Sequence, residues 1–267
     1  MAPHRVRRSV PPGPSSPASP SSGTPLPPDS AAALQPPLFE LEAAAREPAA
    51  AEAVVAAATL SLEQLALACD GCRRCGLAEG RQHVVVSRGT PQARLMVIGE
   101  GPGAQEDASG QPFVGRAGQL LDQMLASVGL DSNRDAYIAN VVKCRPPGNR
   151  KPTPAEIAAC RPWLEQQIRL VDPAVILLAG ASAMEGVLGI KGGITRLRGS
   201  WRQSEQPVLQ GRWLMPILHP SYLLRNPSRE QGSPKWLTWH DLQDVRRRLD
   251  QLAAGPQACS RQESPLL

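Results

Sequence analysis

The sequence has few aromatic residues, no long apolar run and no secretory signal. The last two shortages argue against a membrane protein and a secreted protein. No stretch of about 18 apolar residues occurs, so we expect no membrane-spanning helix. The first residues are basic and lack the apolar centre of a secretory signal peptide, which favours a cytoplasmic protein. They are also rich in Arg and Ser, with no acid before Asp29, so targeting to an organelle stays a second interpretation.

The composition favours one packed domain and an anionic partner. Apolar residues make up 42% of the 267 residues, which is enough for a sizeable core. Aromatic residues make up only 3%, so any aromatic outside a core pattern is conspicuous. The formal net charge of +5 favours a negatively charged partner such as nucleic acid without identifying it.

Proline content divides the chain into a domain and two tails. Residues 1–60 hold 12 of the 28 prolines among Ser and Ala runs, so we expect a disordered extension. Residues 61–252 carry the periodic apolar patterns of a folded domain, which we expect to be a monomer. Residues 253–267 are polar and are expected to form a second disordered tail.

Strand and helix patterns alternate four times within the domain. Ser61 and Gln64 form a capping box for a first helix, and Ser182 is expected to cap another. Ser233 should begin the last helix, which is expected to end at Arg246–Arg248. The expected strands are Leu95–Ile98, Tyr137–Val142, Ala174–Ala179 and Trp213–Leu218. This alternation predicts an α/β fold of three layers, α/β/α, with a central four-stranded, mainly parallel sheet.

Clustered cysteines indicate a metal site, because disulfides are not expected without a secretory signal. Cys72 and Cys75 form a C-x-x-C pair, Cys144 follows 69 residues later, and Cys160 follows after another 16. Four thiolates bind either zinc or an iron–sulfur cluster, and the wide second spacing favours a cluster without deciding the matter. Cys69 forms a second C-x-x-C with Cys72, and the six cysteines are completed by Cys259 in the polar C-terminal tail, which we expect to be a free thiol.

Three loops that follow expected strands are candidates for a site. Gly99–Asp107 is rich in glycine, but it matches neither a dinucleotide-binding fingerprint nor a phosphate-binding loop, and a purely structural turn is an equal alternative. Phe113, flanked by Pro and Gly, could stack on a base or anchor the core. His219 ends an expected strand and is followed by Leu223, Leu224 and Arg225. The two leucines beside Arg225 could insert into a DNA duplex as a wedge, or they could pack against the protein core.

These residues together resemble the family 4 uracil-DNA glycosylases, the iron–sulfur type. The resemblance covers about residues 65–250. Its motifs occur in the family's order: Cys72-Arg-Arg-Cys75-Gly-Leu77, Gly99-Glu-Gly-Pro-Gly-Ala-Gln-Glu-Asp107, Gly110-Gln-Pro-Phe-Val-Gly-Arg-Ala-Gly118, Asn140-Val-Val-Lys-Cys-Arg-Pro-Pro147, Cys160 and His219-Pro-Ser-Tyr-Leu-Leu-Arg-Asn-Pro227. The resemblance implies hydrolysis of the N-glycosidic bond of uracil in single- or double-stranded DNA, a step of base excision repair.

The resemblance also implies roles for the motif residues. The [4Fe–4S] cluster would be bound by Cys72, Cys75, Cys144 and Cys160, and it would order loops rather than do chemistry. Uracil would stack on Phe113, Asn140 would bind its edge and His219 would lie at O2. The glycines Gly99, Gly101 and Gly103 would line the pocket, and Ser221, Leu223, Leu224 and Arg225 would contact DNA.

The sequence departs from better-known relatives at the residues that activate water and exclude thymine. Better-known relatives carry an Asp where this chain has Gly101 and a Tyr where it has Gly103, so Glu100 is the nearest substitute for the acid. Glu106 resembles the family residue thought to exclude the 5-methyl group of thymine, although capping of the next turn is an equal alternative. A non-enzymatic iron–sulfur protein and a zinc-bearing nucleotide hydrolase are the rival interpretations.

Overall fold

The computed structural model describes residues 61–255, and both tails expected from the sequence lie almost wholly outside them. Five strands form one sheet: β1 (Arg88–Gly89), β2 (Leu95–Gly99), β3 (Ala136–Asn140), β4 (Val175–Ala179) and β5 (Trp213–Ile217). The helices are α2 (Leu62–Asp70), α3 (Leu77–Gly80), α4 (Ala104–Ser109), α5 (Arg116–Ala126), the 3₁₀ turn η1 (Pro147–Asn149), α6 (Pro154–Val171), α7 (Ala181–Leu188), α8 (Ile194–Leu197), α9 (Pro220–Arg225) and α10 (Pro234–Ala254).

The sheet has the order β1-β3-β2-β4-β5, with β1 antiparallel to β3 and all other pairs parallel. The sheet therefore has one strand more than the four that the sequence predicted. The four parallel strands were recognisable because each is almost entirely buried and apolar. β1 was missed because it has only two residues, Arg88 and Gly89, and no apolar pattern.

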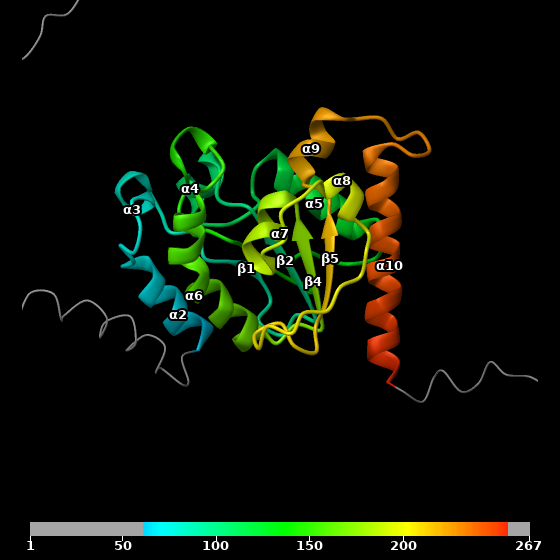
Figure 1. Cartoon of the computed structure of the whole chain (residues 1–267), viewed down its shortest axis with the longest axis horizontal. Coiled ribbons are helices and arrows are strands. Elements are labelled where there is room, and N and C mark those ends of the chain that lie inside the picture. The colour runs from blue at the N-terminus through cyan, green and yellow to red at the C-terminus, as the bar shows by residue number, and fades with distance from the viewer. Residues whose placement is uncertain (1–60, 256–267) are drawn as a thin grey trace, which may run out of the picture. The chain divides into compact units, whose positions relative to one another are not determined.

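Helices cover both faces of the sheet, which confirms the three-layer α/β/α architecture (Figure 1). Successive strand residues alternate between two cores, because side chains along a strand point to opposite faces. On one face, Met96 and Ile98 of β2 pack in a core with residues of α2, α6 and α7. On the other face, Leu95 and Val97 pack with residues of α5 and α10.

Sequence signals at the helix ends were partly right. The capping box at Ser61 is present, and Ser233 caps α10. The last helix does not end at Arg246–Arg248 but continues to Ala254, because Val245 and Leu249 still pack into the core. Ser182 does not cap α7, since Gly180 is its N-cap and Ser182 lies inside the helix with a different partner.

The parallel strands bring their carboxyl ends to one edge of the sheet. Glu100 follows β2, Asn140 ends β3, Gly180 follows β4, and His219 follows β5 after Leu218. In Figure 1 the arrows of β4 and β5 point toward α9, which marks this edge. Active sites of open α/β sheets form beyond such an edge, and the candidate site lies there.

Candidate functional site

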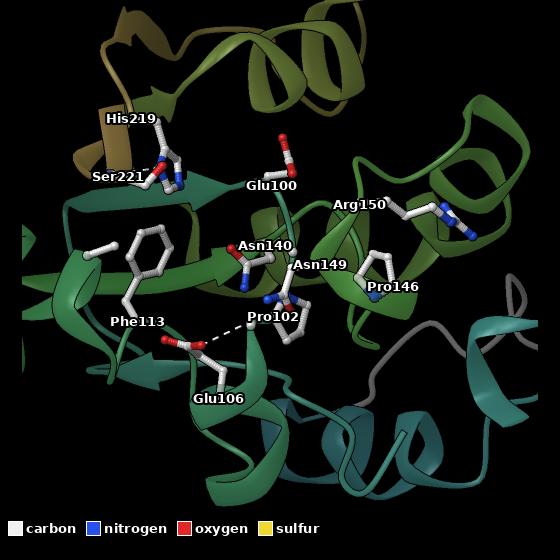
Figure 2. A pocket seen from close by; sticks show the side chains of 13 residues that line it. Glu100, Pro102, Glu106, Phe113, Asn140, Pro146, Asn149, Arg150, His219 and Ser221 are labelled. Atoms are coloured by element: carbon white, nitrogen blue, oxygen red, sulfur yellow. Dashed lines mark hydrogen bonds between the residues drawn. The ribbon is translucent and has the colours of Figure 1, made fainter. Parts of the chain in front are cut away.

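A cavity of about 230 Å³ opens at the carboxyl edge of the sheet (Figure 2). Its lining includes Glu100, Gly101, Gly103, Glu106, Phe113, Asn140, His219 and Ser221, eight of the residues selected from the sequence. It also includes Pro102, Ala117, Pro146, Asn149 and Arg150, which the sequence analysis did not select. Four segments of the chain therefore line one cavity. The segments after β2, β3 and β5 meet there as the strand-end argument predicted, whereas the Phe113 segment follows α4 and not a strand as expected.

Asn140 is the most deeply buried polar group in this cavity. It ends β3, is 2% exposed, and its main-chain carbonyl accepts a hydrogen bond of 2.7 Å from Lys143 Nζ. Within residues 61–255 its side-chain amide makes no hydrogen bond to protein, and it points into the cavity (Figure 2). A buried amide is costly to desolvate without partners, so its free donor and acceptor suit a polar ligand edge.

Phe113 lies opposite this amide and belongs to a distorted loop. Its φ of 55° is in the left-handed region, which a bulky residue rarely adopts. It is 6% exposed, and its ring centroid lies 5.9 Å from that of His219. Gly99 makes room for both groups, since a Cβ there would lie 2.5 Å from Asn140 Oδ1 and 2.5 Å from Phe113 Cζ.

The ring of His219 is held by Ser221. The backbone N–H of Ser221 donates to His219 Nδ1 at 3.1 Å, and the Ser221 hydroxyl lies 2.8 Å from the same nitrogen. Because Nδ1 accepts a hydrogen bond, a neutral ring carries its proton on Nε2. Burial, and secondly the charge of Arg225, lower the pKa of His219 to about 4, so the ring is a neutral N–H donor near pH 7.

Glu100 is anchored by a residue of the neighbouring crossover. The hydroxyl of Ser182, which is 4% exposed, donates to Glu100 Oε2 at 2.5 Å. This bond explains why a Ser that was expected to cap α7 lies inside the helix instead. Glu100 also lines the cavity, and within residues 61–255 its Oε1 accepts no hydrogen bond.

Glu106 joins two of the loops. One carboxylate oxygen accepts from the N–H of Gly103 at 3.1 Å, and the other accepts from Val114 at 3.1 Å and Gly115 at 2.9 Å. The capping alternative considered for this residue is therefore present in the geometry, together with a link to the Phe113 loop. A carboxylate with three backbone donors fixes the relative position of both loops.

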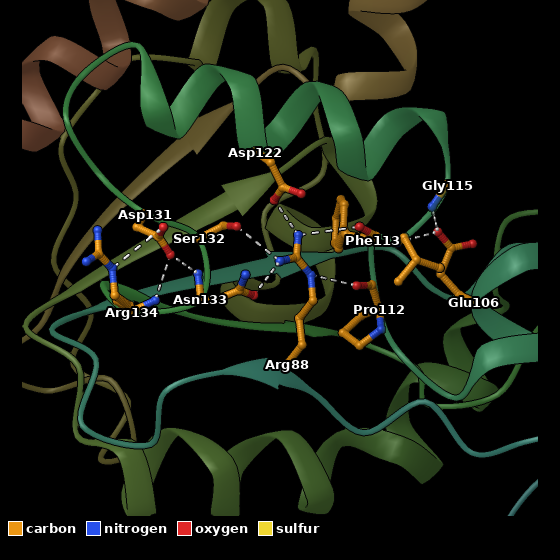
Figure 3. A network of polar contacts seen from close by, with 11 residues as sticks. Arg88, Glu106, Pro112, Phe113, Gly115, Asp122, Asp131, Ser132, Asn133 and Arg134 are labelled. Atoms are coloured by element: carbon orange, nitrogen blue, oxygen red, sulfur yellow. Dashed lines mark hydrogen bonds and ion pairs between the residues drawn. The ribbon is translucent and has the colours of Figure 1, made fainter.

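Arg88 supports the Phe113 loop from below, and the sequence analysis missed it (Figure 3). Its guanidinium donates to the carbonyls of Pro112 at 2.9 Å and Phe113 at 3.4 Å, and forms an ion pair of 2.5 Å with Asp122. Further bonds reach Ser132 and Asn133 at 3.2 Å each. The Arg side chain is only 10% exposed, so these contacts have little competition from water. No local sequence signal marks it, because its partners come from three separate segments.

The DNA-contact candidates after His219 fall in and around α9. Leu223 is 1% exposed and packs in the protein, so the core alternative fits its position. Leu224 is half-buried and Arg225 is exposed at the end of α9. Of these four candidates, Ser221, Leu224 and Arg225 have solvent-accessible surface and Leu223 has almost none.

Five cysteines surround a second, narrower cavity: Cys69, Cys72, Cys75, Cys144 and Cys160. Cys72, Cys75 and Cys144 lie in loops and Cys160 lies on α6, the arrangement expected from the sequence. Among residues 61–255, no three Cys, His, Asp or Glu side chains form a site for a single metal ion. Burial raises the pKa of Cys160 to about 11 and that of Cys69 to about 12, although the positive charge of Lys143 acts to lower both.

Nitrogen donors point at three of these sulfurs. Trp163 Nε1 donates to Cys72 Sγ at 3.3 Å, Arg81 to Cys144 Sγ at 3.4 Å, and the backbone N–H of Lys143 to Cys160 Sγ at 3.3 Å. Lys143 itself is 1% exposed, and within the described residues it has no carboxylate partner. A buried ammonium group is stable only near negative charge, which thiolates at this cavity would supply.

Comparison with known proteins is unambiguous. Residues 86–243 match the family model described as the uracil DNA glycosylase superfamily. The type-4 uracil-DNA glycosylase of Thermotoga maritima is 48% identical over 162 residues, which is 60% of this chain and 81% of that protein. The chain belongs to the type-4 uracil-DNA glycosylases. The type-4 enzyme of Sulfurisphaera tokodaii is 38% identical over 63% of this chain and 78% of its own length.

Type-5 enzymes resemble this glycosylase less. The type-5 uracil-DNA glycosylase of Thermus thermophilus is 32% identical over 50% of this chain and 67% of its own length. Type-4 enzymes commonly carry a [4Fe–4S] cluster, and five cysteines of this glycosylase line the narrower cavity. Within residues 61–255 of the glycosylase, even the longest helices are too polar to cross a membrane.

Replacing Arg88 of the glycosylase with alanine should loosen the Phe113 loop. Removing a buried guanidinium leaves Asp122 and two carbonyls without their partner, so we expect the melting temperature to fall by several degrees. The Michaelis constant for uracil-containing DNA should rise about tenfold, since the Phe113 ring, which lines the cavity, is no longer held in position. Arg88→Lys keeps the positive charge beside Asp122 but loses the forked guanidinium contacts to the loop carbonyls. Its melting temperature and Michaelis constant should therefore fall between those of the wild type and Arg88→Ala. An Arg88→Ala enzyme with unchanged melting and kinetics would contradict this role.

Proposed function

We propose that this uracil-DNA glycosylase cleaves the N-glycosidic bond of a flipped-out deoxyuridine with Asn140, His219 and Glu100 as its working groups. Uracil would enter the cavity beneath the sheet edge and lie against the Phe113 ring. The free amide of Asn140 can accept from uracil N3–H and donate to O4. Cytosine presents the opposite pattern there, which would leave buried groups unpaired.

Charge stabilisation at uracil O2 is the step that we assign to His219. As the bond breaks, electrons flow into the base and the sugar becomes cationic. A neutral imidazole that carries its proton on Nε2 can donate to the developing anion, and electrostatic stabilisation of this kind is usually the largest catalytic contribution. The carboxylate of Glu100, oriented by Ser182, would face the cationic sugar and position the attacking water.

The observation that supports this proposal best is the side-chain amide of Asn140, which faces the cavity and has no hydrogen-bond partner within residues 61–255, on a residue that is only 2% exposed. The decisive test is release of free uracil by the full chain from an oligonucleotide with one deoxyuridine, in single-stranded form and paired with G or A. Oligonucleotides with cytosine or thymine at the same position serve as controls. Absence of uracil release would overturn the assignment.

The cluster ligands that we propose are Cys72, Cys75, Cys144 and Cys160. Three of these sulfurs accept N–H donors, and the buried Lys143 provides positive charge beside the thiolates, so the residues fit an iron–sulfur group. When bound, the cluster supplies structural order to the loops around it and no bond-making chemistry. Lys143 connects the two sites, since its backbone bonds Cys160 and its ammonium group holds the carbonyl of Asn140.

The pH profile should show no titration of His219 near neutrality. Its pKa is lowered from 6.5 to about 4, so the ring stays neutral at pH 5 to 8. Between about pH 4 and 6.5 the folded state therefore binds fewer protons at this group than the unfolded state does. As a result, the contribution of His219 to the free energy of unfolding rises with pH across that window and is constant above it. Nuclear magnetic resonance of the His219 ring and single-turnover rates against pH test both statements. A His219 pKa above 6 would contradict them.

Glu106→Ala should relax the wall that we propose excludes the 5-methyl group of thymine. Three backbone N–H groups lose their acceptor, so we expect a lower melting temperature and reduced uracil release. The relaxed wall should also admit some thymine, and the gain should be modest because a methyl-sized clash is worth only about 1–3 kcal/mol.

Thymine release from a T:G duplex and thermal melting measure the two effects. Glu106→Gln is the matched control, because its carbonyl oxygen can still bind Val114 and Gly115 while the Gly103 bond is lost. Uracil activity that is kept without any thymine release would refute the exclusion role.

A further inference from the structure

A groove of about 440 Å³ lies between α5 and the start of α10, outside the site described above. Its lining combines aromatic and aliphatic groups with two cations: Leu120, Gln123, Met124, Ser127, Arg229, Lys235, Trp236 and Trp239. Trp239 is 43% exposed, although aromatic residues are rare in this chain. Trp is enriched at binding surfaces, where its large ring supplies apolar contact area.

The two Trp rings are held in place by His240. Its ring centroid lies 3.8 Å from that of Trp236 and 5.0 Å from that of Trp239, and its Nδ1 lies 2.8 Å from the carbonyl of Trp236. The two rings are not coplanar, because the Trp236 ring is tilted by 41° and the Trp239 ring by 88° to the His240 ring. Each ring therefore offers its own face at the first turns of α10, and each loses little freedom when a ligand stacks on it.

The charges of the groove are of one sign. Arg229 and Lys235 are its charged lining residues, and within residues 61–255 neither forms an ion pair with a carboxylate. Stacking surfaces beside free cations are the two elements with which proteins bind single-stranded nucleic acid. A base pair in a duplex hides its faces, so this groove suits an unpaired strand rather than a double helix.

The groove and the uracil cavity both border one face of α5. Ala117 lines the cavity, and Leu120, Met124 and Ser127 follow at helical spacing as part of the groove. At about 1.5 Å per residue, Met124 lies roughly 10 Å beyond Ala117. The segment after α9 also leads from exposed Arg225 to Arg229, which lines the groove.

We propose that this groove binds the unpaired DNA strand beside the target uracil, with bases stacked on Trp236 and Trp239 and phosphates at Arg229 and Lys235. The proposal rests on the function given above, because it requires DNA at the uracil cavity. It assigns the groove a ligand class, single-stranded DNA a few nucleotides from the flipped base. It also predicts a preference for uracil with long unpaired flanks.

The kinetic test compares two single-stranded substrates of the full chain, one with two nucleotides on each side of the uracil and one with ten. Trp239→Ala should raise the Michaelis constant about tenfold for the long substrate only and leave kcat unchanged. Leu67→Ala is the matched control, since Leu67 is an apolar side chain on α2 that is 77% exposed. Equal melting temperatures of the variants establish that both are folded.

Salt dependence tests the cations separately. Lys235→Ala should reduce the slope of log affinity against log salt by about 0.7 for the long oligonucleotide, the value for one phosphate contact on a single strand. Arg134→Ala is the control, because Arg134 has a side chain 82% exposed before the amino end of β3, opposite the site. An unchanged slope in Lys235→Ala would overturn the phosphate contact.

Fluorescence separates failure of this proposal from failure of the proposed function. A uracil-free oligothymidine of about 20 nucleotides should quench the Trp emission of the wild type, and Trp239→Ala should lose most of that quenching. Identical long-substrate kinetics and quenching in wild type and Trp239→Ala would overturn the groove proposal while uracil release stands. Absence of uracil release with intact quenching would instead overturn the activity and keep the groove as a DNA-binding surface.

Discussion

His219→Ala should lower the single-turnover rate of uracil release by about 10²–10³-fold, because the departing anion loses a preorganised donor. The loss should appear in the chemical step and not in binding, since uracil would still be held by Phe113 and Asn140. Rates under saturating enzyme, together with the affinity for uracil-containing DNA, separate the two. A loss below tenfold would exclude His219 from the anion role.

Ser221→Ala is the control that isolates the ring's orientation. The hydroxyl beside Nδ1 disappears, but the backbone N–H of residue 221 remains and still fixes the proton on Nε2. The expected loss is therefore less than tenfold. A loss as large as that of His219→Ala would mean that the hydroxyl, and not the backbone, holds the tautomer.

Cys144→Ala should remove the [4Fe–4S] cluster that we propose and destabilise the whole domain. Arg81 donates to Cys144 Sγ and also to the main-chain carbonyls of Cys72 and Asp70. Loss of the sulfur acceptor should therefore loosen the loop that carries the C-x-x-C pair. Because metal binding is coupled to folding, the melting temperature should fall by more than about 10 °C. Iron analysis, absorption near the cluster's broad visible band and thermal melting measure the effect.

Cys69 and Cys259 provide the matched controls. Cys69 lines the same cavity as the proposed ligands, whereas Cys259 lies outside the described residues. Alanine at either position should leave the iron content intact. Loss of iron in Cys69→Ala with iron retained in Cys72→Ala would reassign the ligand set.

Local patterns in the sequence were sufficient for most of the fold. Four buried strands with helices between them specify the layers, and parallel strands oblige Asn140 and His219 to meet at one edge. The two-residue strand β1 has no periodicity to read and was missed. Ser182 was misread because a Ser near the start of a helix is usually a cap, whereas here its hydroxyl binds Glu100 across the sheet edge.

Long-range polar partners and surface grooves could not be read from the chain. Arg88 lies in a segment without a motif, and its acceptors follow 24 to 45 residues later, so only the folded structure reveals that it supports Phe113. Trp236 and Trp239 look like ordinary residues of an amphipathic helix until α5 is seen opposite them. Side chains that act through tertiary contacts leave no trace in local spacing.

The bare backbone at Gly99 has a consequence for changing the base that this enzyme accepts. A Cβ at residue 99 would lie 2.5 Å from both Asn140 Oδ1 and Phe113 Cζ, so any side chain there would displace the amide and the ring at once. Selection for altered base preference therefore cannot begin there, since hydrogen bonding and stacking would be lost together. A library that varies Asn140 while holding residue 99 as glycine keeps the ring in place, and it confines the search to one edge of the base.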